Sequence, residues 1–69
     1  MARISFENGM SVEARVFNME KQGINSVDDT KKFFADQKNE GYVFLKAIID
    51  NDIKKGFFIK EKDMEKLLS

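Results

Sequence analysis

The chain of 69 residues contains no histidine, no cysteine and no proline. Without cysteine no disulfide can form, and without both cysteine and histidine nearly every zinc, copper, haem and iron–sulfur site is excluded. The absence of cysteine also gives no support for an oxidising compartment, where small domains often rely on disulfides. So small a domain must therefore be stabilised by good packing or by a partner. We expect no cofactor and no bound metal.

Long apolar runs are also lacking. The N-terminal residues 1–5 do not provide the apolar stretch of a signal peptide. The longest apolar runs, such as 43–45, are far below the roughly 20 residues that span a bilayer. We expect a cytoplasmic protein without a membrane partner, encoded by a cell or by a phage or plasmid within one.

Neither sign of charge is in excess, because 12 basic residues face 12 acidic ones. Phosphate contacts need a positive excess, so this balance argues against a nucleic-acid binder that depends on bulk electrostatics. It argues equally against a strongly acidic DNA mimic. With 42% hydrophobic residues and charges of mixed sign, the composition is that of a folded chain. We expect a single small domain over residues 1–69.

Residues 2–18 predict an antiparallel β-hairpin, because apolar and polar residues alternate on both sides of Asn8-Gly9. A two-residue turn there would pair Glu7 with Met10. In that register, the apolar residues of the first strand would share a face with the polar residues of the second strand. The apolar pattern therefore argues against a two-residue turn.

A three-residue loop over residues 7–9, with Gly9 left-handed in a bulge, brings the two apolar sides together. We therefore prefer this register. The pairs it predicts are Phe6 with Met10, Ile4 with Val12, and Arg3 with Glu13.

Residues 27–39 predict an α-helix. Ser26 is a good N-cap, and Asp29 follows at the spacing of a capping box. Gly41 is a stop signal just beyond the helix. The apolar stripe is narrow and consists of Val27, Thr30, Phe33, Phe34 and Gln37.

Residues 42–55 fit two structures. As a helix they present isoleucines and a leucine at three- and four-residue spacing, and Gly56 ends the helix. As a strand, alternate residues are apolar up to Ile49, and residues 50–52 turn the chain back. We favour the helix. The alternative has extra strands at 42–49 and 56–60, which would give a four-stranded antiparallel sheet with two helices.

Residues 60–68 predict a C-terminal helix whose apolar side consists of Met64, Leu67 and Leu68. With Gly56 and the apolar segment before it, residues 45–68 resemble the SHOCT-type helical hairpin found at the C-termini of many bacterial proteins. That pattern has a Gly, two apolar residues, a Thr or Ser cap and then acids. Here Ile59 is an additional apolar residue and Lys60 replaces the cap. The resemblance implies a helical hairpin used for interaction or oligomerisation.

The segment 50–56 resembles the start of a calcium-binding EF-hand loop. Asp50 and Asp52 occupy the first and third positions, but the fifth is Lys54 and the glycine arrives one position late. We therefore interpret residues 50–52 as a turn or a helix end. The chain also lacks a phosphate loop and a histidine base for a nucleophile, and its acids lie on polar faces or beside lysines. We predict that it is not an enzyme.

The seven phenylalanines are the remaining signal. A two-layer domain of this size has one core, so some rings should lie at its margin unless the helices bury them all. An exposed aromatic patch fits a protein partner or a second copy of the chain. Phe6 and one ring of the pair Phe33 and Phe34 are assigned to the core. The candidate partner-binding residues are the unassigned rings and nearby lysines: Phe17, Phe57, Phe58, Lys54, Lys55 and Lys60.

The predicted fold class is α+β, with the N-terminal hairpin packed against two or three short helices. The predicted core consists of Ile4, Phe6, Val12, Ala14, Val16, Phe34, Leu45, Ile49 and Leu67.

The predicted function is that of a small non-enzymatic module that docks on another protein. Size and composition suggest, by analogy, an accessory or inhibitor protein of a phage or mobile element, such as an anti-defence protein. One alternative is a nucleic-acid-binding regulator, because lysines interleaved with aromatic rings can bind single strands. Another is a homo-oligomeric structural module.

Overall fold

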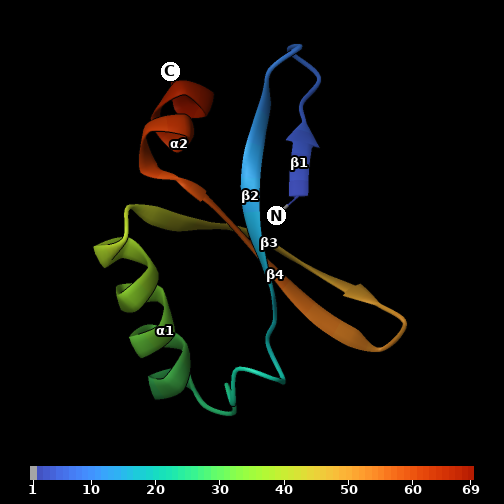
Figure 1. Cartoon of the computed structure of the whole chain (residues 1–69), viewed down its shortest axis with the longest axis vertical. Helices are drawn as coiled ribbons and strands as arrows, with labels where there is room; N and C mark the ends of the chain where they lie inside the picture. Colours follow the sequence, from blue (N-terminus) through green and yellow to red (C-terminus); the bar gives the residue numbers. More distant parts are fainter. Residues whose placement is uncertain (1) are drawn as a thin grey trace.

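The structure is a computed structural model that describes residues 2–69. Its elements are β1 (Ala2–Ser5), β2 (Ser11–Asn18), α1 (Val27–Asn39), β3 (Tyr42–Asp50), β4 (Ile53–Lys60) and α2 (Glu61–Leu68) (Figure 1). The four strands form one antiparallel sheet in the order β1-β2-β4-β3. The α+β class is confirmed, and the arrangement found is the four-stranded alternative. Neither helix in the described part of the chain is long and apolar enough to cross a membrane.

The hairpin of β1 and β2 has the register that the sequence predicts. The Phe6 N–H donates to the Met10 carbonyl at 2.8 Å, and Ile4 pairs with Val12. Gly9 has a φ of +85°, the left-handed conformation that the three-residue loop requires. Local alternation and one glycine therefore determine this part of the fold.

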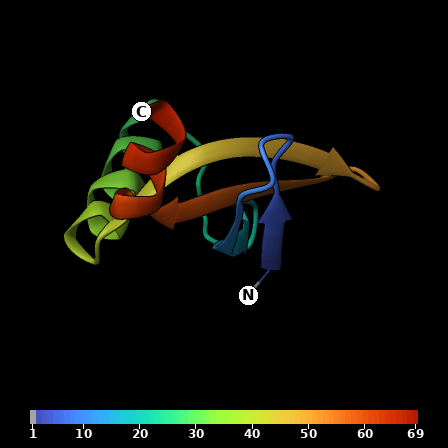
Figure 2. The ribbon, with the colours of Figure 1, turned by 90° about the horizontal axis from the view of Figure 1, so that it is seen from above.

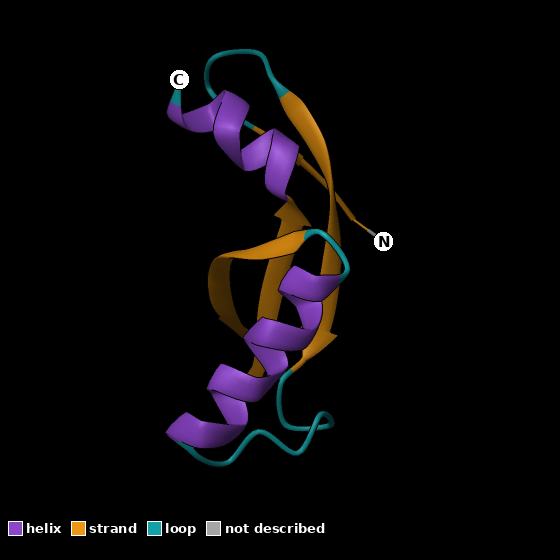
Figure 3. Cartoon of the chain, turned by 90° about the vertical axis from the view of Figure 1, so that its left-hand side faces the viewer, coloured by secondary structure: helices purple, strands orange, loops and turns teal. Residues whose placement is uncertain are grey.

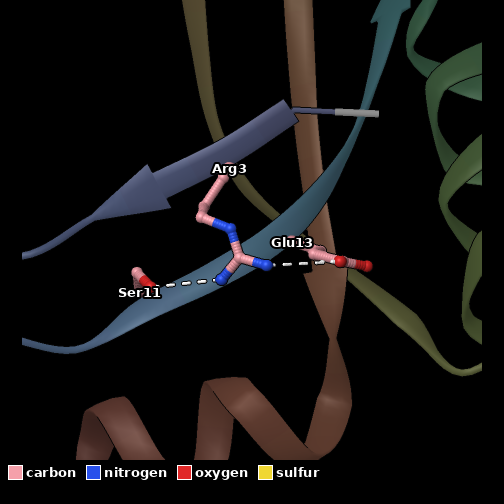
Figure 4. Close-up of polar contacts among 3 residues, drawn as sticks. All are labelled: Arg3, Ser11 and Glu13. Carbon is pink, nitrogen blue, oxygen red and sulfur yellow. Dashed lines mark hydrogen bonds and ion pairs between the residues drawn. The ribbon is translucent and has the colours of Figure 1, made fainter.

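Arg3 crosses the polar face of this hairpin. Its guanidinium lies between Ser11 and Glu13, with hydrogen bonds of 3.2 Å to the Ser11 hydroxyl and 3.4 Å to the Glu13 carboxylate (Figure 4). Both members of the ion pair are more than half exposed, so this contact adds little stability.

Helix α1 begins and ends where the sequence predicts. The Ser26 side chain accepts a hydrogen bond from the Asp29 N–H at 3.1 Å, and Asp29 in turn accepts one from the Asn25 N–H at 3.2 Å. The first bond satisfies a backbone donor in the first turn of the helix, and the second satisfies the donor of the residue before the N-cap. Gly41, with a φ of +86°, follows the last turn.

The predicted helix over residues 42–55 is wrong, because this segment forms β3 and the start of β4. The two strands are joined at Asn51 and Asp52, whose φ values of 52° and 64° are those of a two-residue hairpin turn. The interpretation of residues 50–52 as a turn is confirmed. Within residues 45–68, for which the sequence resembles a SHOCT-type hairpin, the structure has the end of β3, all of β4 and helix α2.

The physical reason lies in the sheet. A two-stranded hairpin alone is marginal, and a helix over 42–55 would leave β1 and β2 in that state. As a strand, β4 pairs with both β2 and β3. It then buries Phe58 and Ile59, the two largest side chains with no exposed surface.

Alternation along β4 sends these two side chains to opposite faces of the sheet. Phe58 packs against Phe33 and Phe34 of α1, at ring-centroid distances of 5.6 and 5.4 Å. Ile59 clusters with Val12 and Ala14, and α2 adds Met64 and Leu67 to that cluster. The sheet therefore has two small cores, one beneath each helix.

Both helices lie at the same end of the molecule, and the tip of the β3–β4 hairpin points away from them (Figures 1 and 2). Seen from the helix side, α1 and α2 stand in front of the strands (Figure 3). The hairpin tip is thus the part of the sheet that neither helix reaches.

Two predicted core residues are exposed instead. Val16 is 36% exposed, because it lies beyond the reach of α2, and Ile49 is 75% exposed near the hairpin tip. The other predicted core residues are buried or packed at the margin of a core: Ile4, Phe6, Val12, Ala14, Phe34, Leu45 and Leu67. The buried apolar residues that the sequence did not identify are Met19, Tyr42, Phe58 and Ile59.

Candidate functional site

The predicted partner-binding residues are divided between the two faces of the sheet. Phe17 and Phe58 lie together beneath α1, with ring centroids 5.7 Å apart, and Phe17 meets Phe33 edge-on at 5.0 Å. Phe58 has no exposed surface, so it cannot contact a partner while the domain is folded. These two rings, which the sequence left unassigned and proposed for partner binding, belong to the core beneath α1.

Phe57 faces the opposite side of the sheet and is half-buried. It pairs with Val16 of β2 and with Lys46 of β3, whose Nζ lies 5.6 Å from the ring centroid. Lys55 is on the same face, and its Nζ lies 3.6 Å from the carboxylate of Asp50. Phe57 and Lys55 are thus the two predicted residues that share this face of the sheet.

The other two predicted lysines lie elsewhere. Lys54 alternates with Lys55 and faces the α1 side, while its carbonyl accepts a hydrogen bond from the Met19 N–H at 2.9 Å. Lys60 is the residue before α2, pairs with Tyr42 and makes no side-chain capping bond. The three predicted lysines therefore do not form one surface.

The uncovered part of the sheet around Phe57 is the candidate functional site. Helix α2 packs on the Val12, Ala14 and Ile59 end of this face and leaves the other end open. Val16 and Ile48 are 36% and 40% exposed there. We call this surface the open face, and it consists of Val16, Lys46, Ile48, Ile53, Lys55 and Phe57.

Four residues of the open face were missed by the sequence prediction. The period-two alternation of β3 places Lys46 and Ile48 on one side, so the strand interpretation contains this signal. The helix interpretation hid it, because a helical spacing groups Ile48 with Ile49 instead.

The open face adjoins a free sheet edge, since β3 is the last strand of the sheet. The Lys54 carbonyl accepts its hydrogen bond on the β2 side of β4. The backbone groups of successive strand residues point in alternate directions, so the N–H and C=O groups of Ile53 and Lys55 point toward β3. Their partners in β3, Asp50 and Ile48, point the same groups back toward β4. The alternate residues Ala47 and Ile49 therefore direct their N–H and C=O groups outward, away from the sheet. These backbone groups are available to another strand.

A second polar cluster lies at the C-terminal end of α1. Arg15 donates to the Gln37 side-chain oxygen at 3.1 Å and to the Glu40 carboxylate at 3.0 Å, and its Cζ lies 3.8 Å from the Tyr42 ring centroid. The hydrogen bond that Arg15 donates to the Glu40 carboxylate raises the pKa of Arg15, although desolvation opposes this. Gln37 is only 6% exposed. The cluster connects β2, α1 and β3, and we interpret it as a structural contact.

This interpretation predicts that Arg15→Ala destabilises the fold. The substitution removes the hydrogen bond to the buried Gln37 amide, and an unsatisfied buried polar group is costly. The urea midpoint should fall further than for Arg3→Ala, which removes an exposed ion pair of the same residue types. Equal midpoints for the two variants, measured by circular dichroism, would contradict the structural role.

Residues 2–69 hold no group of three or more histidine, cysteine, aspartate or glutamate side chains placed to bind a metal ion. No protein family, no curated protein and no solved structure matches the chain.

Proposed function

We propose that the chain is a non-enzymatic protein-interaction module that binds its partner through the open face and the adjoining edge of β3. One observation carries the proposal: on a hairpin that projects beyond both helices, Ile48 of the open face is 40% exposed, and Ile49, on the other side of the same edge strand, is 75% exposed (Figure 1). Exposed apolar side chains gathered along one strand at the edge of a small domain are typical of a contact surface.

The composition of the open face supports this function. Phe57 provides an aromatic centre with Val16 and Ile48 on either side, and aromatic anchors often dominate binding energy. Lys46 and Lys55 supply a polar border, and the rim of a protein interface is polar. A partner would offer an apolar surface bordered by carboxylates.

The biological setting is part of the same proposal. A short chain without a catalytic constellation fits an accessory or inhibitor protein, such as an anti-defence protein of a phage or mobile element, and this rests on analogy. The absence of cysteine is consistent with a cytoplasmic location. The lysines are spread over both faces, so no observation favours the nucleic-acid alternative.

Site-specific photo-crosslinking in the native host tests the proposal. A photoreactive phenylalanine analogue at position 49 should form an adduct with a protein, because that side chain is mostly exposed on the edge strand β3 that adjoins the open face. The control position is Ala35, which is exposed on α1, away from the open face. The same analogue at this position should form less adduct than at position 49. Adding Ile48→Lys should abolish the adduct from position 49.

Ile48→Lys must leave the fold intact for this test. An exposed substitution away from caps and cores changes the free energy of unfolding by about 0.5 kcal/mol. Adducts of equal yield from positions 35 and 49, or an adduct that persists in the folded Ile48→Lys variant, would show that the open face is not the contact surface.

A further inference from the structure

The free edge of β3 is complementary to itself. Residues 46–50 read Lys-Ala-Ile-Ile-Asp, with a cation at one end and an anion at the other. When two copies of this segment run antiparallel about a centre at Ile48, Lys46 of each copy lies opposite Asp50 of the other. Ile48 then lies opposite its own counterpart. Opposite charges and apolar side chains at facing positions both stabilise paired strands.

The backbone of β3 is arranged for the same pairing. Ala47 and Ile49 direct their N–H and C=O groups outward, as the bonding of the Lys54 carbonyl toward β2 requires. Centred on Ile48, the pairing sets Ala47 of one copy opposite Ile49 of the other, so these outward groups exchange hydrogen bonds. Ile48 and the two charged pairs then occupy the non-hydrogen-bonded positions, where facing side chains are closest.

Other registers lose this match. A centre at Ala47 places Lys46 opposite Ile48, and a centre at Ile49 places Asp50 opposite Ile48. Each leaves charges facing an aliphatic side chain. The bulge between Phe44 and Lys46 and the turn after Asp50 limit the regular edge to residues 46–50. One register therefore fits the available edge.

We propose that the partner of the β3 edge is a second copy of the chain, joined edge to edge through antiparallel β3 strands. This inference rests on the proposed function and names its partner. The interface is two-fold symmetric, so each contact occurs twice. The two sheets become one continuous sheet, and the open faces of both copies meet at Ile48 on the same side. The paired segment is short, so the dimer is in exchange with the monomer.

Sedimentation equilibrium of the full chain over about a hundredfold range of concentration tests this, because mass action converts monomer to dimer as concentration rises. Wild type should approach twice the monomer mass. Lys46→Glu and Asp50→Lys should each weaken association by roughly tenfold, since two opposite-charge pairs become like-charge pairs. An equimolar mixture of the two variants should associate as wild type does, because the mixed dimer regains both opposite-charge pairs.

Lys32→Glu is the matched control, because it makes the same charge change on an exposed residue of α1 and should not alter association. The inference is overturned if wild type stays monomeric, if the mixture associates no better than its components, or if Lys32→Glu weakens association as much as Lys46→Glu. A monomeric wild type that still crosslinks from position 49 to a different protein would refute self-pairing and leave the proposed function standing. If wild type neither dimerises nor crosslinks from position 49, both the self-pairing and the proposed function are refuted.

Discussion

Phe58→Ala is expected to destabilise the folded chain by about 3–5 kcal/mol, the usual cost of removing a fully buried phenylalanine. Phe58 has no exposed surface and contacts four rings, those of Phe17, Phe33, Phe34 and Phe44. Domains are stable by roughly 0.05–0.15 kcal/mol per residue, so the loss would consume much of the stability of a chain this short. Urea unfolding followed by far-ultraviolet circular dichroism measures it.

Phe57→Ala is the matched control for this prediction, since it removes the same ring from the adjacent position of β4. Phe57 is half-buried on the open face, and its loss should cost clearly less. Equal losses for the two variants would mean that the alternation of β4 does not divide the two faces in solution as described.

The second large effect is expected at Ile59, on the other face of the sheet. Ile59→Ala should cost about 2–5 kcal/mol, because the side chain is fully buried between Val12 and Ala14 and supports α2. An eight-residue helix is not stable by itself, so α2 depends on this packing. In the Ile59→Ala variant, hydrogen exchange should show that the backbone amides of α2 lose protection before those of α1.

Ile49→Ala is the corresponding control, because Ile49 is 75% exposed near the hairpin tip. Its effect on the free energy of unfolding should stay within about 0.5 kcal/mol. A loss at Ile49 comparable to that at Ile59 would indicate that the hairpin tip is covered in the isolated chain, and the β3 edge would then lack its most exposed apolar side chain.

The two helices explain why a contact surface is left at all. Each covers one face of the sheet at the same end of the molecule, and neither extends over the β3–β4 tip (Figures 1 and 2). A chain of this length has too little material to cover both faces completely. The apolar residues of the tip are therefore exposed because of the size and connectivity of the chain.

Local features of the sequence determined the β1–β2 register and the bounds of α1. The register follows from alternation on both arms and from the left-handed Gly9, while Ser26 and Asp29 mark the start of the helix. Each of these signals acts over a few residues, so they could be interpreted without the rest of the fold.

Only the tertiary structure decided the state of residues 42–60 and the composition of the open face. A short apolar run fits both helical and strand periods, and the choice depends on pairing between β4 and the distant strand β2. Phe57 and Phe58 are the same residue type in adjacent positions of β4, a strand that pairs with neighbours on both sides. Because side chains alternate along a strand, they point to opposite faces, and Phe58 joins a core while Phe57 is half-buried. Burial is set by what packs on each face, and no local pattern contains that information.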